Sequence, residues 1–321
     1  MATRNGFKYN HQTQALELYV NGKQVTSFAQ SQAKTYYVNY ATGSDTNDGL
    51  SWGTAFKQVN AAIIASEATR KVTWTNPSTG VVYSSTYDQN CRNQIIIQGV
   101  NADYDAVSYT TNTTEPYFTD IYGLSGYQRA TLMGQVVIGH HDNSKRALYM
   151  YAPLGTNMYN LQFEGGTASL YCAVVANAIG CQWLDCSFVA YTGGIGAFST
   201  TGTFCGNHID GCMFESAGGG GTYVFVNSGE NSSDNLIENS IFISTGTYTN
   251  SIKWVGWGVG DLIRNCNFSG PGTTAVGIAD TSGCGIAVQS CYFGSNFTDC
   301  ISNTHAGDVS NIMHANALET L

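Results

Sequence analysis

The sequence predicts an all-β protein made of stacked coils, and its composition and an internal repeat both support this prediction. The chain has 321 residues, of which 37 are Gly. Gly, Asn, Ser and Thr, which are abundant here, are poor residues for a helix interior. Charged residues make up 11% of the chain, against about 25% in an ordinary globular domain. One short apolar and aromatic pattern recurs through the second half, which is typical of a solenoid.

The repeat has the form apolar-x-(Asn/Gly/Asp/Ser)-(Cys/Ser)-x-Phe. Its final positions follow one another after 21 to 28 residues, a length that suits one coil per repeat. A turn residue at the third position tolerates positive φ, so the first, fourth and sixth side chains can all face inward. The five clear copies are Trp183–Phe188, Ile209–Phe214, Ile237–Phe242, Ile263–Phe268 and Val288–Phe293, and the two weaker flanking copies are Met158–Phe163 and Val309–His314.

Stacking of these coils predicts two ladders in the interior. The sixth positions form an aromatic ladder, and the fourth positions form a ladder of small side chains beside it. Because a Cys thiol packs as a small hydrophobe, we expect the Cys of this ladder to be reduced and buried. The aromatic ladder consists of Phe163, Phe188, Phe214, Phe242, Phe268 and Phe293, and the small-residue ladder consists of Cys186, Cys212, Ser240, Cys266 and Cys291.

The Ile-x-Asn-Cys-x-Phe coil resembles the repeats of right-handed parallel β-helix proteins, the pectate-lyase-like group that includes many bacteriophage tailspikes. Residues 36–63 resemble the entry module of the same group. This resemblance implies a strand and a short helix with Phe56, Val59 and Ile63 on one face, which caps the open first coil. The matches cover residues 35 to about 316, and they imply the fold class, an all-β right-handed parallel β-helix.

The N-terminal segment is predicted to be a separate attachment arm. In residues 15–28, Asn21-Gly22 stands between two strand-like runs, which is the strongest short signal for a β-hairpin. An isolated hairpin is marginal in water, so we expect it to dock on a partner. We therefore divide the chain into an arm of residues 1–34 and a β-helix domain of residues 35–321, in which the entry strand and capping helix occupy 35–66 and the coils run to about residue 316.

The charge balance and the absence of targeting segments argue against several partners. Thirteen Lys and Arg against 22 Asp and Glu give a net charge of −9, which leaves no basic footprint for nucleic acid. No apolar stretch approaches the roughly 18 residues of a membrane span, and residues 1–10 show no signal peptide. The Cys spacings lack the close pairs of zinc sites, and adjacent His140 and His141 would point to opposite faces of a strand. We expect no cofactor, no metal, no nucleic acid and no membrane partner.

One pair of carboxylates is a candidate for catalysis. The second repeat position points outward and places Asp210 beside Glu238, and Glu238 beside Arg264, on coils about 4.8 Å apart. Glycoside hydrolysis uses two carboxyl groups about 5 Å apart for retention, or about 6.5–9.5 Å apart for inversion. The alternative interpretation is a solvated ladder in which Arg264 offsets the two acids.

Trp254 and Trp257 are candidates for contact with sugars. Their odd separation places one in the core and the other in solvent if a single strand runs through both. Ile252 would share the face of Trp254, so Trp257 is the candidate for an exposed sugar-stacking platform. Burial beneath a loop is the alternative for Trp257.

These features favour a non-enzymatic structural protein. The resemblance implies a bacteriophage virion protein exposed on the particle surface, of the capsid decoration or tail spike and fibre type, attached to other virion proteins through residues 1–34. It also implies a homotrimer that is made in the host cytoplasm without a signal peptide. The alternative is a tailspike-type polysaccharide depolymerase, a glycoside hydrolase or lyase, that binds host surface polysaccharide and uses Asp210 and Glu238.

Overall fold

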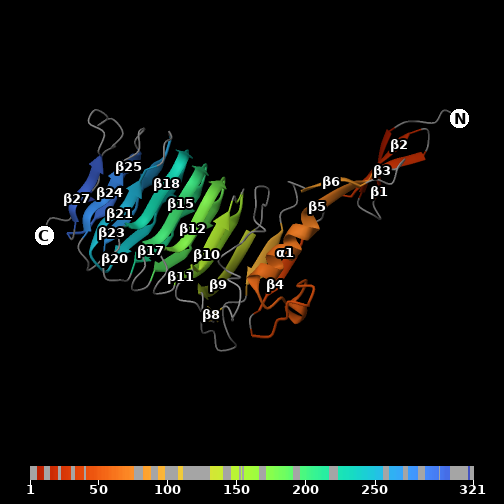
Figure 1. The fold of residues 1–321 in the computed structure, drawn as a ribbon, viewed down its shortest axis with the longest axis horizontal. Coiled ribbons are helices and arrows are strands. Elements are labelled where there is room, and N and C mark those ends of the chain that lie inside the picture. Colours follow the sequence, from red (N-terminus) through yellow and green to blue (C-terminus); the bar gives the residue numbers. More distant parts are fainter. Residues whose placement is uncertain are drawn as a thin grey trace.

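A computed structural model gives the structure of the protein, and strands dominate it (Figure 1). The described residues are 6–10, 15–20, 23–29, 33–39, 41–75, 82–87, 93–97, 108–110, 131–139, 146–151, 153, 155–165, 171–190, 196–216, 223–255, 260–269, 274–280, 286–295, 297–303 and 317–318. Strands of successive repeats lie side by side and pair in parallel. The predicted all-β parallel β-helix is therefore confirmed.

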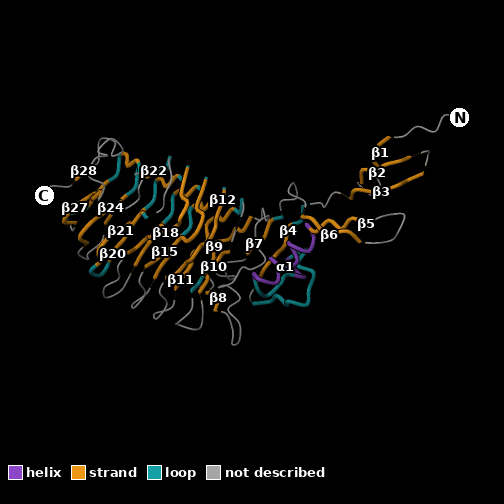
Figure 2. The backbone as a smooth tube through the Cα atoms, turned by 45° about the horizontal axis from the view of Figure 1, so that its top comes forward, coloured by secondary structure: helices purple, strands orange, loops and turns teal. Residues whose placement is uncertain are grey.

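One face of the solenoid is a seven-stranded parallel sheet. Each strand comes from a different coil, and the order in the sheet follows the order in the chain (Figures 1 and 2). The inner strands pair with the coil above and with the coil below, so each coil offers a template for the next. The strands are β10 (Leu148–Tyr151), β12 (Tyr171–Ile179), β15 (Gly196–Cys205), β18 (Tyr223–Ser233), β21 (Tyr248–Trp254), β24 (Thr274–Asp280) and β27 (Phe297–Asn303).

Two rows of short strands form the rest of each coil. Strand β11 (Asn157–Gly165) belongs to both rows, because it bends at Asn160, whose φ is 52°. Its first half pairs with β13 and its second half with β14. One row is β13 (Gln182–Leu184), β16 (His208–Asp210), β19 (Leu236–Glu238), β22 (Leu262–Arg264) and β25 (Ala287–Gln289), and the other is β14 (Ser187–Ala190), β17 (Met213–Ser216), β20 (Ile241–Ser244), β23 (Asn267–Ser269), β26 (Tyr292–Phe293) and β28 (Ala317–Leu318).

The turn between the two rows has the backbone conformation that the repeat predicts. The third repeat position has positive φ in all five clear copies, with values from 50° to 63°. Gly and Asn adopt this left-handed conformation at low cost, which explains their frequency at the position. In each of these copies the side chains at the first, fourth and sixth positions are buried. The residues with positive φ are Asp185, Gly211, Asn239, Asn265 and Ser290.

The predicted aromatic ladder runs through the interior. From Phe163 to Phe293, neighbouring rings of the ladder stack with centroids 4.7 to 5.3 Å apart and interplanar angles of 8° to 11°. A second aromatic column of Phe198, Phe225 and Trp254 comes from the seven-stranded sheet and packs edge-on against the first. The two columns together fill the centre of the coils.

The Cys ladder is buried as predicted. Cys186, Cys212, Cys266 and Cys291 are each at most 2% exposed. None of the eight cysteines in the described part of the chain forms a disulfide. Cys181 is also buried, and burial raises the pKa of its thiol to about 11, so this thiol stays protonated.

A polar column accompanies the two aromatic columns, and the sequence analysis did not identify it. Asn207, Asn235 and Asp261 directly precede β16, β19 and β22 and are at most 4% exposed. The side-chain oxygen of each accepts a hydrogen bond from a main-chain amide one coil earlier: Cys181 N to Asn207, Asn207 N to Asn235, and Asn235 N to Asp261. The column thus satisfies buried amides where one strand turns into the next.

The entry module differs from the prediction in where its helix lies. Strand β4 (Thr35–Val38) and the 3-10 turn η1 (Trp52–Thr54) precede α1 (Val59–Arg70), so the helix starts after Phe56 and runs beyond Ile63. Phe56 is buried but lies in a bridge to Val38. The Asp45 carboxylate accepts hydrogen bonds from Lys57 N and Gln58 N, the two residues directly before the helix, and so holds the chain where the helix begins.

The strands between the entry module and the coils continue the stack. β4 pairs in parallel with β7 (Gln94–Ile97), which pairs with β9 (Thr131–Gly139), and β9 pairs with β8 (Ser108–Thr110) and β11. Strands are therefore present at the predicted positions 95–97 and 136–138, and Ile95 and Ile97 are buried as predicted. An antiparallel hairpin of β5 (Lys71–Thr75) and β6 (Val82–Tyr87) follows α1.

The N-terminal segment forms a three-stranded antiparallel sheet. The predicted hairpin is present as β2 (Ala15–Val20) and β3 (Lys23–Ala29), and β1 (Gly6–Asn10) adds a third strand. This sheet pairs with no other sheet in the described residues, and Figure 2 shows it beyond the β5–β6 hairpin. It is the element that we expect to act as an attachment arm.

At the other end, the ladder continues differently from the prediction. The residue that pairs with Phe293 is Leu318, 25 residues later, so it takes the place that we expected for His314. This spacing matches the period of the preceding coils. The weaker repeat copy Val309–His314 lies outside the described residues. None of the described helices has the length and apolarity that crossing a membrane requires.

Candidate functional site

The outward face of β16, β19 and β22 brings the predicted acidic pair together. Asp210 pairs in register with Glu238, and Glu238 pairs with Arg264. The adjacency that the repeat predicts is therefore confirmed. Each residue is the last of a three-residue strand, directly before the positive-φ turn, so the turn column fixes where these side chains emerge.

Glu238 is held at both carboxylate oxygens. Arg264 contacts Oε2 twice, through Nε at 2.7 Å and Nη2 at 2.6 Å. His208 Nε2 lies 2.8 Å from Oε1. Glu238 is only 9% exposed, although it lies on the outer face, because the side chains of its two partners cover it. The sequence offered a solvated ladder of charged side chains as the alternative interpretation. In the structure, Glu238 at the centre of this ladder belongs to an ion-pair cluster that is largely covered.

The electrostatics of this cluster favour an ionised Glu238. Burial raises the pKa of its carboxyl group, but the hydrogen bonds and charges of Arg264 and His208 outweigh burial. The pKa of Glu238 therefore lies below its ordinary value. A general acid needs the opposite, a raised pKa that keeps a proton available near neutral pH.

His208 completes the cluster, and the sequence analysis missed it. It lies two residues before Asp210 on β16, and residues two apart on a strand share a face. The ligand atoms of His208, Asp210 and Glu238 all lie within 4.8 Å of one another. Asn239 also belongs to this surface, because its Nδ2 donates a hydrogen bond of 2.8 Å to Asp210 Oδ1. Strand alternation applied to the residue before the repeat would have found His208.

The separation of the two carboxylates resembles that of retaining glycosidases, in which the groups lie about 5–5.5 Å apart. The chemistry of the pair differs from that of a catalytic pair. The oxygens of Glu238 are engaged by a guanidinium and an imidazole, and the group is covered. A nucleophile or an acid must reach the sugar with a free oxygen, which Glu238 does not offer in this arrangement.

The other residues predicted to carry function are only partly described. Trp254 is buried in β21 and shares its inward face with Ile252, as predicted. Its Nε1 donates a hydrogen bond of 3.1 Å to Asp261 Oδ2. Trp257, the candidate sugar platform, lies outside the described residues, as do His140 and His141.

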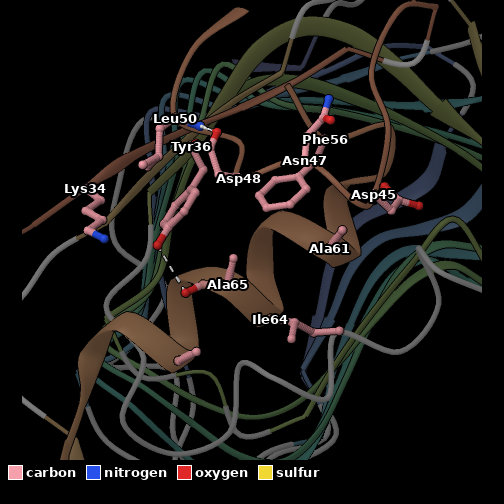
Figure 3. Close-up of a pocket in the computed structure, with 11 residues that line it drawn as sticks. Lys34, Tyr36, Asp45, Asn47, Asp48, Leu50, Phe56, Ala61, Ile64 and Ala65 are labelled. Carbon is pink, nitrogen blue, oxygen red and sulfur yellow. Dashed lines mark hydrogen bonds between the residues drawn. The ribbon is translucent and has the colours of Figure 1, made fainter. Parts of the chain in front are cut away.

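An open hollow of about 560 Å³ lies between the entry loop and α1, away from the acidic pair (Figure 3). Its two acidic groups have structural partners. Asp45 caps the helix, and Asp48 Oδ1 accepts a hydrogen bond from Leu50 N. That hydrogen bond, with one from Thr54, holds the pKa of Asp48 below its usual value. The hollow thus shows apolar surface at Leu50 and Ile64 but no pair of groups arranged for catalysis.

Comparisons with known proteins add a fold likeness. Neither a protein-family model nor a curated protein sequence matches the chain. Among solved structures, the chain is similar to the crystal structure of pectate lyase Pel9A, with 14% sequence identity and a TM-score of 0.44. The match covers 89% of this chain and 80% of that chain. The assignment of the fold rests on the strand pairing of the chain itself, which is that of a parallel β-helix.

Proposed function

We propose that this protein is a non-enzymatic structural protein, exposed on the surface of a bacteriophage virion and attached to other virion proteins through residues 1–34. The proposal places the N-terminal sheet on the particle and the β-helix outward. Capsid decoration and a tail spike or fibre both suit this arrangement, and we propose a homotrimer as its assembled form.

One observation carries the non-enzymatic part of the proposal. The acidic pair on the coils is the arrangement closest to a catalytic site in the described residues, and Glu238 is engaged at both oxygens by Arg264 and His208. Its pKa is lowered, and its side chain is covered. A group in this state stabilises the contact between coils and does not donate a proton to a leaving group.

The organisation of the chain supports the attachment part of the proposal. The strands β1, β2 and β3 pair only with one another in the described residues. Among the residues whose burial is described, Tyr36 and Val38 belong to the core of the β-helix. A small sheet is marginal on its own and is stabilised by packing against another surface, which suits an attachment arm.

A polysaccharide depolymerase is the second candidate, and the separation of the two carboxylates favours it. Asp210 and Glu238 have ligand atoms within 4.8 Å of each other, which is close to the separation of about 5–5.5 Å in retaining hydrolysis. In this case a substrate would have to displace Arg264 or His208 from Glu238.

The test compares three forms of the protein for binding to purified virions and for cleavage of host surface polysaccharide. We expect the whole chain to bind virions and to leave polysaccharide intact. Deletion of residues 1–34 should abolish binding while circular dichroism still shows the β-helix. Replacement of Asp210 by Asn together with Glu238 by Gln should leave virion binding unchanged.

Two outcomes would reject parts of the proposal. If the shortened chain still binds virions, residues 1–34 are not the attachment arm. If the whole chain cleaves polysaccharide and the double variant does not, the depolymerase assignment replaces the structural one.

A further inference from the structure

His208, Asp210 and Glu238 offer one imidazole and two carboxylates on the same outward face. His208 and Asp210 are two residues apart on β16, and Glu238 is the register partner of Asp210 on β19. The three ligand atoms lie within 4.8 Å of one another, and His208 Nε2 is 2.8 Å from Glu238 Oε1. The imidazole sets this cluster apart from an ordinary ladder of surface charges.

We propose that these three side chains bind a zinc ion that links two neighbouring coils of the β-helix. The ligands would be His208 Nε2, one oxygen of Asp210 and Oε1 of Glu238, with water at the fourth position. Protein ligands sit about 2.0–2.2 Å from zinc, so neighbouring ligand atoms of a tetrahedral site lie about 3.4 Å apart. On binding, the 2.8 Å between His208 Nε2 and Glu238 Oε1 would widen to this spacing, and the other ligand atoms, which lie within 4.8 Å of one another, would adjust to it.

The surrounding groups fit a metal ligand set. Arg264 contacts only Oε2 of Glu238, so a bound ion would replace the hydrogen bond between Oε1 and His208 Nε2 and leave the contact with Arg264 in place. Asn239 Nδ2 donates to Asp210 Oδ1, and so orients that carboxylate. Carboxylate ligands of metals are commonly fixed by such outer hydrogen bonds. With neutral His208, the two carboxylates and Arg264 sum to a net charge of −1, so the site attracts a cation.

The ligand types select a transition metal over calcium or magnesium. Imidazole nitrogen is a preferred ligand of zinc, whereas calcium takes six to eight oxygen ligands. Besides the imidazole, the site supplies two carboxylates, which Asn239 and Arg264 hold in position, and this is fewer oxygen ligands than calcium takes. The side chain of His208 is 31% exposed, which gives an ion a route to the nitrogen. The Cys spacings and the adjacent pair His140 and His141 predict no metal site, whereas this cluster lies elsewhere, on the outward face of β16 and β19.

Such an ion would act as a staple between β16 and β19. It would bind the folded protein only, because the three ligands come together through coil stacking, and would stabilise it by mass action. This role is independent of virion attachment, and it requires no catalytic activity.

The test measures zinc binding to the metal-free whole chain by isothermal titration calorimetry, and melting with and without zinc. His208→Gln is the main variant, because Gln keeps a donor for Glu238 but is a poor zinc ligand. We expect this variant to bind one zinc ion fewer per chain than the parent, and we expect zinc not to raise its Tm. Asp210→Asn should weaken binding at least about tenfold, the size of effect that loss of even an outer contact produces.

The matched control is Asp185→Asn. Asp185 is an exposed acid in the turn column one coil away, so the Asp185→Asn variant should bind zinc like the parent. Anomalous diffraction at the zinc edge from soaked crystals should place the ion beside His208 Nε2. Equal zinc stoichiometry in the parent and His208→Gln, or calcium binding that equals zinc binding and survives His208→Gln, would overturn the proposal.

Discussion

On strands β17, β20 and β23, the inward side chains are Phe214, Phe242 and Phe268, while the outward neighbours are Met213, Ile241 and Asn267. The inward ring is the same on every coil and is fully buried. The outward residue changes from coil to coil and ranges from apolar to polar. The same strands thus carry one position that repeats and another that varies.

The difference shows which constraint each face obeys. In the Phe column an interior ring stacks on an identical ring above and below, so its shape repeats from coil to coil. An outward side chain contacts water or one or two neighbours, so each coil can carry a different residue. The buried acids follow this division: Asp261 in the interior receives four hydrogen bonds from neutral donors, whereas Glu238 outside is held by Arg264 and His208.

The largest contrast between the two faces is expected at adjacent residues of β20. Phe242→Ala removes a fully buried ring from the ladder and should lower the free energy of unfolding by about 3–5 kcal/mol. Ile241→Ala, on the outward face and 41% exposed, should change it by less than about 0.5 kcal/mol. Urea denaturation followed by circular dichroism measures both. Similar losses for the two variants would show that the faces are not energetically distinct.

A smaller loss is expected in the polar column. Asn235→Ala removes the acceptor of Asn207 N and leaves that buried amide without its side-chain partner. An unsatisfied buried group costs about 1–3 kcal/mol, so the free energy of unfolding should fall by this amount. The control is Asn267→Ala on the exposed face of β23, which should have little effect. A neutral Asn235→Ala would mean that the column does not support the turns.

The two buried acids should respond to pH in opposite directions. Burial raises the pKa of Asp261, so its contribution to stability is present below the unfolded value of 3.8 and is lost as pH rises through the folded pKa. The pKa of Glu238 is lowered, so its contribution is present above 4.5 and is lost as pH falls through the folded pKa.

Urea midpoints between about pH 3 and pH 7 test this contrast. Relative to Asp261→Asn, the parent should lose stability as pH rises. Relative to Glu238→Gln, it should lose stability as pH falls. Parallel pH profiles for the two comparisons would show that neutral and cationic partners have the same effect on a buried carboxylate.

The smallest effect is expected in the turn column, the residues with positive φ between the two rows of short strands. Ser290 has a φ of 52° and is the one residue of the five in the turn column that is not Gly, Asn or Asp. Ser290→Gly relieves this strain and should raise the free energy of unfolding by about 0.5–1 kcal/mol. Thermal melting measures the gain. A loss of stability would show that the Ser side chain has a role in the turn that outweighs the strain.

The sequence predicts the interior of the coils well because the interior repeats. The Phe ladder, the buried Cys ladder and the positive-φ turn all follow when the six residues of each repeat copy are aligned with those of the next copy. The neighbours Asp210, Glu238 and Arg264 also follow, since parallel coils bring equal positions together.

The rest depends on contacts that no short pattern contains. Asp45 starts α1 from 14 residues before Val59, so the helix could not be placed from its own residues. The column of Asn207, Asn235 and Asp261 lies two positions before the first residue of each repeat copy, outside the six-residue pattern. His208 was missed for the same reason. Leu318 replaces His314 because the weak final copy of the repeat does not keep the period.

The stacking of equal repeat positions also gives the outer surface of the β-helix a regular spacing of side chains. The outward residues before the turn column emerge on successive coils about 4.8 Å apart, and they are Leu184, Asp210, Glu238, Arg264 and Gln289. The interior is specified by other positions, so exchange of these residues would leave the Phe ladder and the turn column in place. The surface would then display chosen chemical groups in a straight line at a fixed spacing, which suits an engineered scaffold for arrays of ligands or for templating a repeating polymer.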